Sequence, residues 1–193
     1  HLNEEALASA EALVRWEKEG KLIPPNDFIP ILEQKGLITK LDFYVLEQVC
    51  RKMQSWKNEG RELIEIAVNF SRRHLENPDF IQNLCSIADQ YGIPHYLLVV
   101  ELTETAMWEN EKNMIQMVEQ LHENGFLMAM DDFGTGYSSL SLLKNLPVDI
   151  VKIDRSFFYD NQYKDRARIL ISNVMNMAKQ LGMVTVAEGI EEQ

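Results

Sequence analysis

Short apolar runs alternate along this chain with longer segments in which apolar residues recur every three or four positions. The short runs are nearly continuous, as in Leu97-Leu98-Val99-Val100, a pattern typical of parallel strands that are covered on both faces. The predicted strands are Ala8–Val14, Ile64–Asn69, Leu97–Glu104, Leu127–Asp132, Asp149–Asp154 and Met183–Glu188.

The segments between these strands have the periodicity of amphipathic helices. Several finish at a residue that commonly ends a helix: Gly60, Gly92, Gly125 and Gly182 can adopt the left-handed conformation, and Pro147 follows the fifth. Strands that alternate with helices predict βα units, a parallel sheet and the α/β class. The predicted helices are Phe28–Gln34, Asp42–Asn58, Pro78–Gln90, Glu109–Glu123, Ser138–Leu146 and Asp165–Gln180.

Composition indicates one cytoplasmic domain. The chain has 193 residues, of which 46% are hydrophobic, enough for a core of its own. No apolar stretch approaches the ~20 residues of a membrane span, and the first residues have neither the basic nor the apolar region of a signal peptide. Cys50 and Cys85 lie in predicted helices without metal-ligand spacing, so we expect free thiols.

The charge narrows the classes of partner. Thirty acidic residues against nineteen Lys and Arg give a formal net charge of −11. Nucleic-acid polymers and anionic membranes are bound through basic patches, so both are disfavoured as partners. A small anionic substrate stays possible if metal ions or local cations offset the field.

Nearly every predicted strand ends in a residue that can bind a metal ion or move a proton. One such residue often only caps the next helix, but here the feature repeats on successive strands. In an open sheet the outer strands would lie tens of ångströms apart, at ~4.8 Å per strand. A (β/α)8 barrel gathers them at its C-terminal rim and is favoured over an open doubly wound sheet. The residues are Glu11, Asn69, Glu101, Glu104, Asp131, Asp132, Lys152, Asp154 and Glu188.

The ligand set contains only oxygen donors, which Mg²⁺ or Mn²⁺ prefer, and none of the four histidines has a ligand-like position. So many carboxylates favour two ions, ~3.5–4 Å apart. Asp131 and Asp132 can both serve only if the strand ends or bulges there, which Gly134 and Gly136 make plausible. Lys152 has two interpretations: an ion pair with Asp154, or a group that holds water and steadies phosphate charge.

Several motifs occur in an order that resembles the EAL-domain family. They are the run EALVRW from Glu11, the run DDFGTGYSSL from Asp131 and the run KIDRSF from Lys152. Members are metal-dependent phosphodiesterases with a TIM-like barrel. The resemblance implies one metal ion held by Glu11, Asn69, Glu101 and Asp131, and a second held by Asp131, Asp132 and Glu188.

The resemblance also assigns residues around the metals. Lys152 would help activate the water, with Asp154 in support, and Glu104 would fix the loop 133–139. Glu11, Lys152, Glu104 and Asp154 thus form the implied catalytic set, whereas the implied substrate contacts are Leu13, Arg15 and Glu191.

The implied reaction is hydrolysis of the bacterial second messenger cyclic di-GMP to linear pGpG. One alternative is a catalytically silent cyclic di-GMP receptor, which tolerates lost ligands; the complete acid set here favours an enzyme. Another is an enolase-like barrel with Mg²⁺ and a lysine base, which does not explain the segment Asp131–Gly136.

The resemblance runs from about Ser9 to the end of the chain. We expect residues 1–7 to be the remnant of a connecting helix and residues 8–193 an EAL domain that is incomplete at the first and last strands. Relatives imply a tether to a sensory or diguanylate-cyclase domain, a homodimer through the 133–139 loop, and a cytoplasmic location, alone or as part of a membrane-anchored protein.

Overall fold

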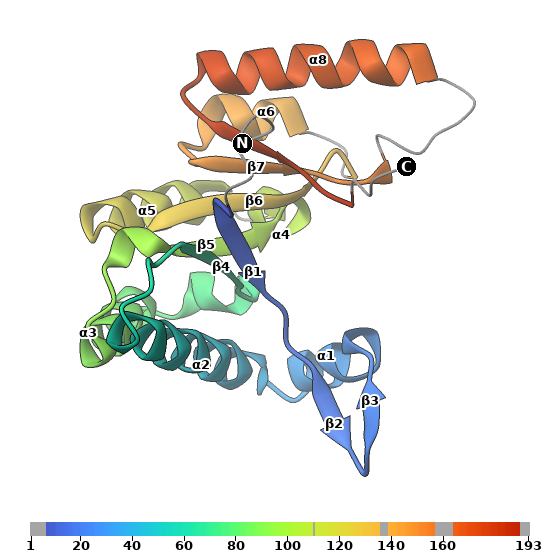
Figure 1. Ribbon diagram of the computed structural model, residues 1–193. Coiled ribbons are helices and arrows are strands. Elements are labelled where there is room, and N and C mark those ends of the chain that lie inside the picture. Colours follow the sequence, from blue (N-terminus) through green and yellow to red (C-terminus); the bar gives the residue numbers. More distant parts are fainter. Residues whose placement is uncertain (1–6, 110, 136–138, 157–163, 190–193) are drawn as a thin grey trace. The chain divides into compact units, whose positions relative to one another are not determined.

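The computed structural model describes residues 7–109, 111–135, 139–156 and 164–189 (Figure 1). The chain divides into two compact units. Unit 1 comprises residues 1–100 with 124–126, and unit 2 comprises residues 101–123 with 127–193.

Unit 1 begins with a strand and a hairpin. Two helices, a further strand and another helix follow, with a 3-10 helix on either side of the last helix. Figure 1 shows the hairpin of β2 and β3 beside α1. The elements are β1 (Ser9–Ala12), β2 (Trp16–Lys18), β3 (Lys21–Ile23), α1 (Pro25–Gln34), α2 (Ile38–Asn58), β4 (Glu65–Asn69), η1 (Arg72–Glu76), α3 (Phe80–Tyr91) and η2 (His95–Leu97).

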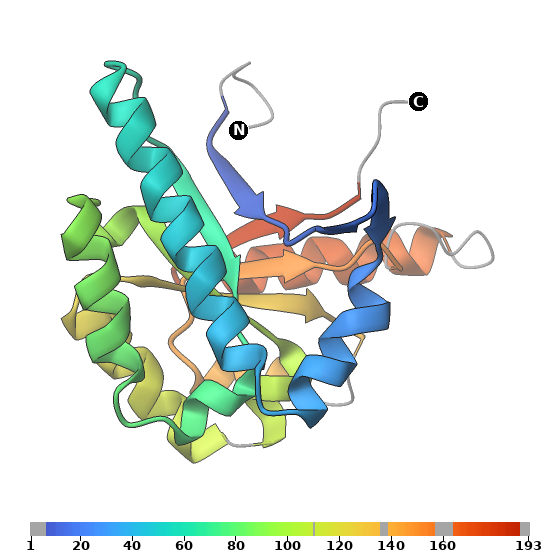
Figure 2. The same cartoon turned by 90° about the horizontal axis from the view of Figure 1, so that it is seen from below.

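Strand β5 (Leu98–Thr103) runs from unit 1 into unit 2. In unit 2, α8 packs against β8, and the two views of Figures 1 and 2 show this helix beside the last strands. The further elements of unit 2 are α4 (Glu104–Glu109), α5 (Glu111–Glu123), β6 (Leu127–Phe133), α6 (Ser139–Asn145), β7 (Ile150–Ile153), α8 (Lys164–Gln180) and β8 (Val184–Ala187).

The hydrogen-bonded strand order is β1-β4-β5-β6-β7-β8, and β2 pairs only with β3 among the described strands. The pairs β1–β4, β6–β7 and β7–β8 are parallel. The predicted α/β class with parallel strands is therefore confirmed, and the larger sheet has six strands among the described residues.

The long helices of unit 1 bury the apolar faces that the sequence pattern marks. In α2, the side chains of Leu46, Cys50 and Met53 are at most 1% exposed, and this spacing of four and three residues places them on one helix face. Leu84 and Ala88 do the same for α3, which packs on α2. Burial of these stripes holds the helices in place, since apolar burial contributes ~25 cal/mol per Å².

In unit 2 the strands β6 and β7 are almost wholly buried, whereas β8 is not. Met128, Met130 and Val151 are fully buried, so methionine serves as core filler here. Val184 and Val186 of β8 are 60% and 37% exposed. The last strand in the order thus has apolar side chains on its surface.

The structure contains two elements that the sequence did not predict, the hairpin β2–β3 and the helix α4. The hairpin β2–β3 was not predicted; its turn is Glu19-Gly20, with φ of 54° and 76°, as a two-residue turn between twisted strands requires. The strand predicted to end at Glu104 ends at Thr103, because Glu104 begins the separate helix α4. Other boundaries shift by a few residues.

Several expectations on single residues are confirmed. Gly60, Gly92, Gly125 and Gly182 all have positive φ. Both cysteines are free thiols. Within the described residues no helix combines the length and apolarity that a membrane span requires.

Candidate active site

Glu11 and Asn69 meet in unit 1. Parallel pairing of β1 with β4 sets Glu11 opposite Ala67, so Asn69 lies two residues further along and on the same face. Asn69 Nδ2 donates a hydrogen bond of 2.7 Å to Glu11 Oε1. Because the amide nitrogen is directed at Glu11, the amide oxygen is turned away from Glu11 Oε1.

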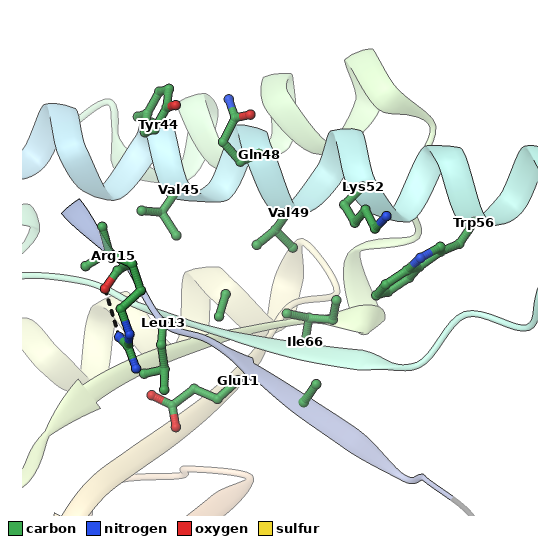
Figure 3. Close-up of a pocket in the computed structure, with 13 residues that line it drawn as sticks. Glu11, Leu13, Arg15, Tyr44, Val45, Gln48, Val49, Lys52, Trp56 and Ile66 are labelled. Atoms are coloured by element: carbon green, nitrogen blue, oxygen red, sulfur yellow. Dashed lines mark hydrogen bonds between the residues drawn. The ribbon is translucent and has the colours of Figure 1, made fainter. Parts of the chain in front are cut away.

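A cavity of about 400 Å³ lies between α2 and the segment from Ala10 to Arg15 (Figure 3); Glu11 is part of its lining and Asn69 is not. Its two walls come from β1 with the residues after it, and from α2. The predicted substrate contacts Leu13 and Arg15 line it together with Glu11. Arg15 Nη1 donates to the backbone oxygen of Val14 at 2.8 Å, as the dashed line in Figure 3 marks.

The opposite wall adds polar groups at the surface of an otherwise apolar lining. Tyr44, Gln48 and Lys52 of α2 line the cavity, and the Lys52 ammonium lies 5.7 Å from the centre of the Trp56 ring. With Arg15, Lys52 gives the cavity two cationic groups, which suit an anionic ligand with apolar or aromatic parts.

The second group of predicted residues surrounds Lys152 in unit 2. Lys152 is 5% exposed and Glu101 is fully buried. The Lys152 ammonium is paired closely with Glu101 and lies 2.8 Å from Glu188 Oε1 and 3.2 Å from Asp131 Oδ1. A buried lysine is tolerable with such partners. These three ion pairs of Lys152 are with acids other than Asp154, so the interpretation of Lys152 as an ion-pair partner of Asp154 stays a prediction.

The predicted irregularity at Asp131 and Asp132 is present. The register of β6 on β7 shifts between Met130 and Phe133, and Asp132 has a φ of 55°. This bulge directs both neighbouring carboxylates to one side. One carboxylate oxygen each of Asp131, Asp132 and Glu188 lies within 4.8 Å of the others.

Charge crowding is visible at Asp132. Burial raises the pKa of this carboxyl, and the nearby acids Asp131, Asp154 and Glu188 raise it further, whereas Lys152 lowers it. Asp131 Oδ1 is buried and, among the described residues, accepts no hydrogen bond, although the Lys152 ammonium lies 3.2 Å from it. Three clustered carboxylates are hard oxygen donors, which fit a divalent cation such as Mg²⁺ or Mn²⁺.

Glu104 holds the start of the loop after β6. It is 2% exposed, and its Oε2 accepts a hydrogen bond of 2.8 Å from the backbone N–H of Gly134. Asp154 receives the backbone N–H of Ser156 at 2.8 Å, and hydrogen bonds from Ser156 lower the pKa of its carboxyl. Residues 136–138 of the loop and the predicted contact Glu191 lie outside the described residues.

One buried polar pair escaped the sequence analysis. No role was predicted for His74 from the sequence, but this residue is 1% exposed and its Nε2 lies 3.0 Å from Asp42 Oδ2. The two residues are 32 positions apart, and no spacing motif links them. Only the packing of α2 against the turn after β4 brings them together.

Comparison with known proteins gives consistent matches over almost the whole chain. A family described as "EAL domain" matches residues 1–193. "Probable cyclic di-GMP phosphodiesterase PdeG" of Escherichia coli is 36% identical over 97% of this chain and 37% of its own length. "Cyclic di-GMP phosphodiesterase NbdA" of Pseudomonas aeruginosa is 37% identical over 94% of this chain and 23% of its own length.

Among solved structures, the one titled "PaMucR Phosphodiesterase, c-di-GMP complex" superposes with a TM-score of 0.86 at 33% identity. It covers 95% of this chain and 74% of its own. The match with this chain spans 37% of the length of the Escherichia coli relative and 23% of that of the Pseudomonas aeruginosa relative.

Proposed function

Because the chain belongs to the EAL domain family, we propose that it hydrolyses one phosphodiester bond of cyclic di-GMP to linear pGpG, using two divalent ions, Mg²⁺ or Mn²⁺. The observation that carries the proposal is the bulge at Asp131-Asp132, which gathers acids around the buried Lys152. Relatives named cyclic di-GMP phosphodiesterases at 36–37% identity support the substrate.

The proposed metal ligands are all oxygen donors. Bound divalent ions would neutralise phosphate charge and acidify a water molecule. Without such ions the acidic residues would repel an anionic phosphodiester substrate. The chain as a whole adds to this repulsion, because its net charge is −11. One ion is assigned to Glu11, Asn69, Glu101 and Asp131, and the other to Asp131, Asp132 and Glu188.

Lys152 is proposed to orient the attacking water and to steady the charge that develops on the phosphate. Its pairing with Glu101 and Glu188 fixes the ammonium group, and preorganised donors act without reorganisation cost during the reaction. Asp154 is proposed to support Lys152 from the end of the same strand, and Glu104 to anchor the loop that follows β6 through Gly134.

Arg15 is proposed to bind a phosphate of the substrate, with Leu13 against the nucleoside and Glu191 as a further contact. The cavity that Leu13 and Arg15 line supports this assignment. The same cavity favours the second candidate, a silent cyclic di-GMP receptor, because its cations and apolar lining require no metal ion for binding.

Incubation with cyclic di-GMP and Mg²⁺ or Mn²⁺, followed by nucleotide chromatography, separates the two. Hydrolysis yields pGpG, whereas a receptor retains cyclic di-GMP without product. An absence of both binding and product would favour the enolase-like alternative.

The matched variants are Glu11→Gln and Glu17→Gln. Loss of a direct ligand in Glu11→Gln should lower turnover by more than the about 10- to 100-fold that loss of a ligand-orienting residue costs. Glu17 is exposed on β2, so the same substitution there should leave turnover unchanged. Full turnover in Glu11→Gln would refute the metal assignment.

A further inference from the structure

Asp42 connects α2 to the turn that follows β4. Its Oδ2 accepts a hydrogen bond of 2.9 Å from the backbone N–H of Ser71 and lies 3.0 Å from His74 Nε2. Asp42 is 6% exposed. A buried carboxylate is costly unless it is hydrogen-bonded, so this pair of contacts holds the turn firmly to the helix.

An aromatic cluster encloses the same contact. The His74 ring lies 5.0 Å from Phe43, 5.4 Å from Phe70 and 4.5 Å from Phe80, measured between ring centres. His74 Nδ1 is buried and has no hydrogen-bond partner among the described residues. A proton on Nε2 therefore satisfies Asp42 and leaves a lone pair, not a stranded donor, at Nδ1.

The turn between these contacts is itself ordered. The backbone oxygen of Ser71 accepts from the N–H of His74 at 3.0 Å, and Ser71 Oγ accepts from the N–H of Arg73 at 3.3 Å. Phe70, between Asn69 and Ser71, is 7% exposed and packs on Phe80. The residues directly after Asn69 are thus fixed in backbone and side chain.

Asn69 lies between this turn and the β1–β4 ladder. The ladder is paired in register up to Val68 with Ala12, and the Asn69 amide points its nitrogen at Glu11 Oε1 at 2.7 Å. Rotation of the backbone after β4 would change where the amide oxygen of Asn69 points. The contacts of Asp42 with Ser71 and His74 oppose this rotation from α2, together with the packing of Phe70 on Phe80.

We propose that Asp42 is a positioning residue for Asn69: its buried contacts with Ser71 and His74 set the direction of the Asn69 amide oxygen towards a metal ion. The inference rests on the proposed function, in which Asn69 is a metal ligand. Asp42 acts through the turn and touches neither substrate nor metal. Its loss should therefore weaken metal binding without removing it.

The test is a calorimetric Mn²⁺ titration of the whole chain without nucleotide, at a temperature where circular dichroism shows each variant to be folded. The binding event that Asn69→Ala removes is the one to follow. In Asp42→Ala its dissociation constant should rise about tenfold, as for other residues that orient a ligand. Asp42→Asn keeps an oxygen acceptor and should change it far less.

Met53→Ala provides the matched control for stability. Met53 is fully buried on the same helix, so the substitution should lower the melting temperature without a change in the Mn²⁺ dissociation constant. Equal effects of Asp42→Ala and Met53→Ala on that constant would overturn the proposal, because Asp42 would then only stabilise the fold.

His74→Phe provides a second route if Asp42→Ala does not fold. The new ring keeps the aromatic packing but removes one of the two contacts of Asp42, so a smaller rise in the same dissociation constant is expected, and no rise overturns the proposal. A wild-type chain that binds Mn²⁺ but yields no pGpG would refute hydrolysis alone. Mn²⁺ binding insensitive to Asn69→Ala would overturn the positioning role.

Discussion

Lys152 and Glu101 show how strongly single residues of this site depend on one another. Both are buried, and the ammonium group also faces Asp131 and Glu188. Charges at such depth are stabilised by their partners and by little else. Truncation of either residue therefore affects the fold as well as the chemistry.

Lys152→Met should abolish turnover and, with a chelator present, lower the free energy of unfolding by about 3–5 kcal/mol, because Glu101 loses a buried cation. Urea denaturation measures the change. Lys179→Met, at an exposed position of α8, is the control and should differ little from wild type. An unchanged midpoint for Lys152→Met would show that the buried pair contributes nothing to stability.

The burial of the Cys50 thiol leads us to expect a loss of stability at alkaline pH. Burial raises the pKa of its thiol from an ordinary 9.0 to about 12. Between these values the unfolded chain releases a proton that the folded chain keeps, so stability falls as pH rises, by at most about 1.4 kcal/mol per pH unit. Below pH 9 the thiol has no such effect.

Urea titrations at pH 8 and pH 10 test this sign. Cys50→Ala is the reference, because it retains every other alkaline titration. The wild type should lose more stability between the two pH values than the variant does. Equal losses would contradict the role of this thiol.

Features of the candidate site were predictable from the sequence where they depend on residues adjacent along the chain. The bulge followed from Asp131-Asp132 before a glycine. The partners of Lys152 did not follow, because they depend on the register of other strands. The pair Asp42–His74 was missed for the same reason: it forms only when α2 packs on η1.

Among the elements, long periodic segments were predicted well and short exposed ones were not. α2 and α8 end at the predicted residues and begin within four residues of the predicted ones. β2 and β3 have three residues each and are largely exposed, so no hydrophobic alternation marks them, and only Glu19-Gly20 signals their turn. Glu104 shows why boundaries are hard to predict, since a carboxylate suits the end of a strand and the first turn of a helix alike.

The end of α3 allows a test at this scale. Gly92 has a φ of 64°, and its N–H closes the helix on the oxygens of Ala88 and Asp89. A side chain there would meet only Lys57 Nζ, at 3.8 Å, so the cost is conformational. Gly92→Ala should lower the free energy of unfolding by about 1 kcal/mol, and Gly92→Asn by less; thermal unfolding distinguishes them, and Ala and Asn variants of equal stability would contradict the explanation.

For the whole molecule, the sequence predicted the class, the parallel strands and the residues that cluster in each unit. The joining of Glu11 and Asn69 with the acids of unit 2 into one metal site stays a prediction. So do the homodimer through residues 133–139 and the tether to a further domain, although the relatives are several times longer than the part that matches.

Metal binding should be measurable as a gain in the stability of the folded molecule. A ligand at 100 times its dissociation constant stabilises a folded protein by about 2.7 kcal/mol. Mn²⁺ at that excess should raise the melting temperature, and Asp131→Asn should greatly reduce the rise, because Asp131 is assigned to both ions. The same rise in wild type and variant would place the metal elsewhere.

The exposed valines of β8 have a consequence for handling the protein. Among the described strands this one is last in the sheet order, and its side chains Val184 and Val186 are exposed. An outer strand with exposed apolar side chains can pair with a strand of another molecule. Concentrated samples should therefore self-associate along this border first, and a lysine introduced at position 186 is the simplest means of keeping them dispersed.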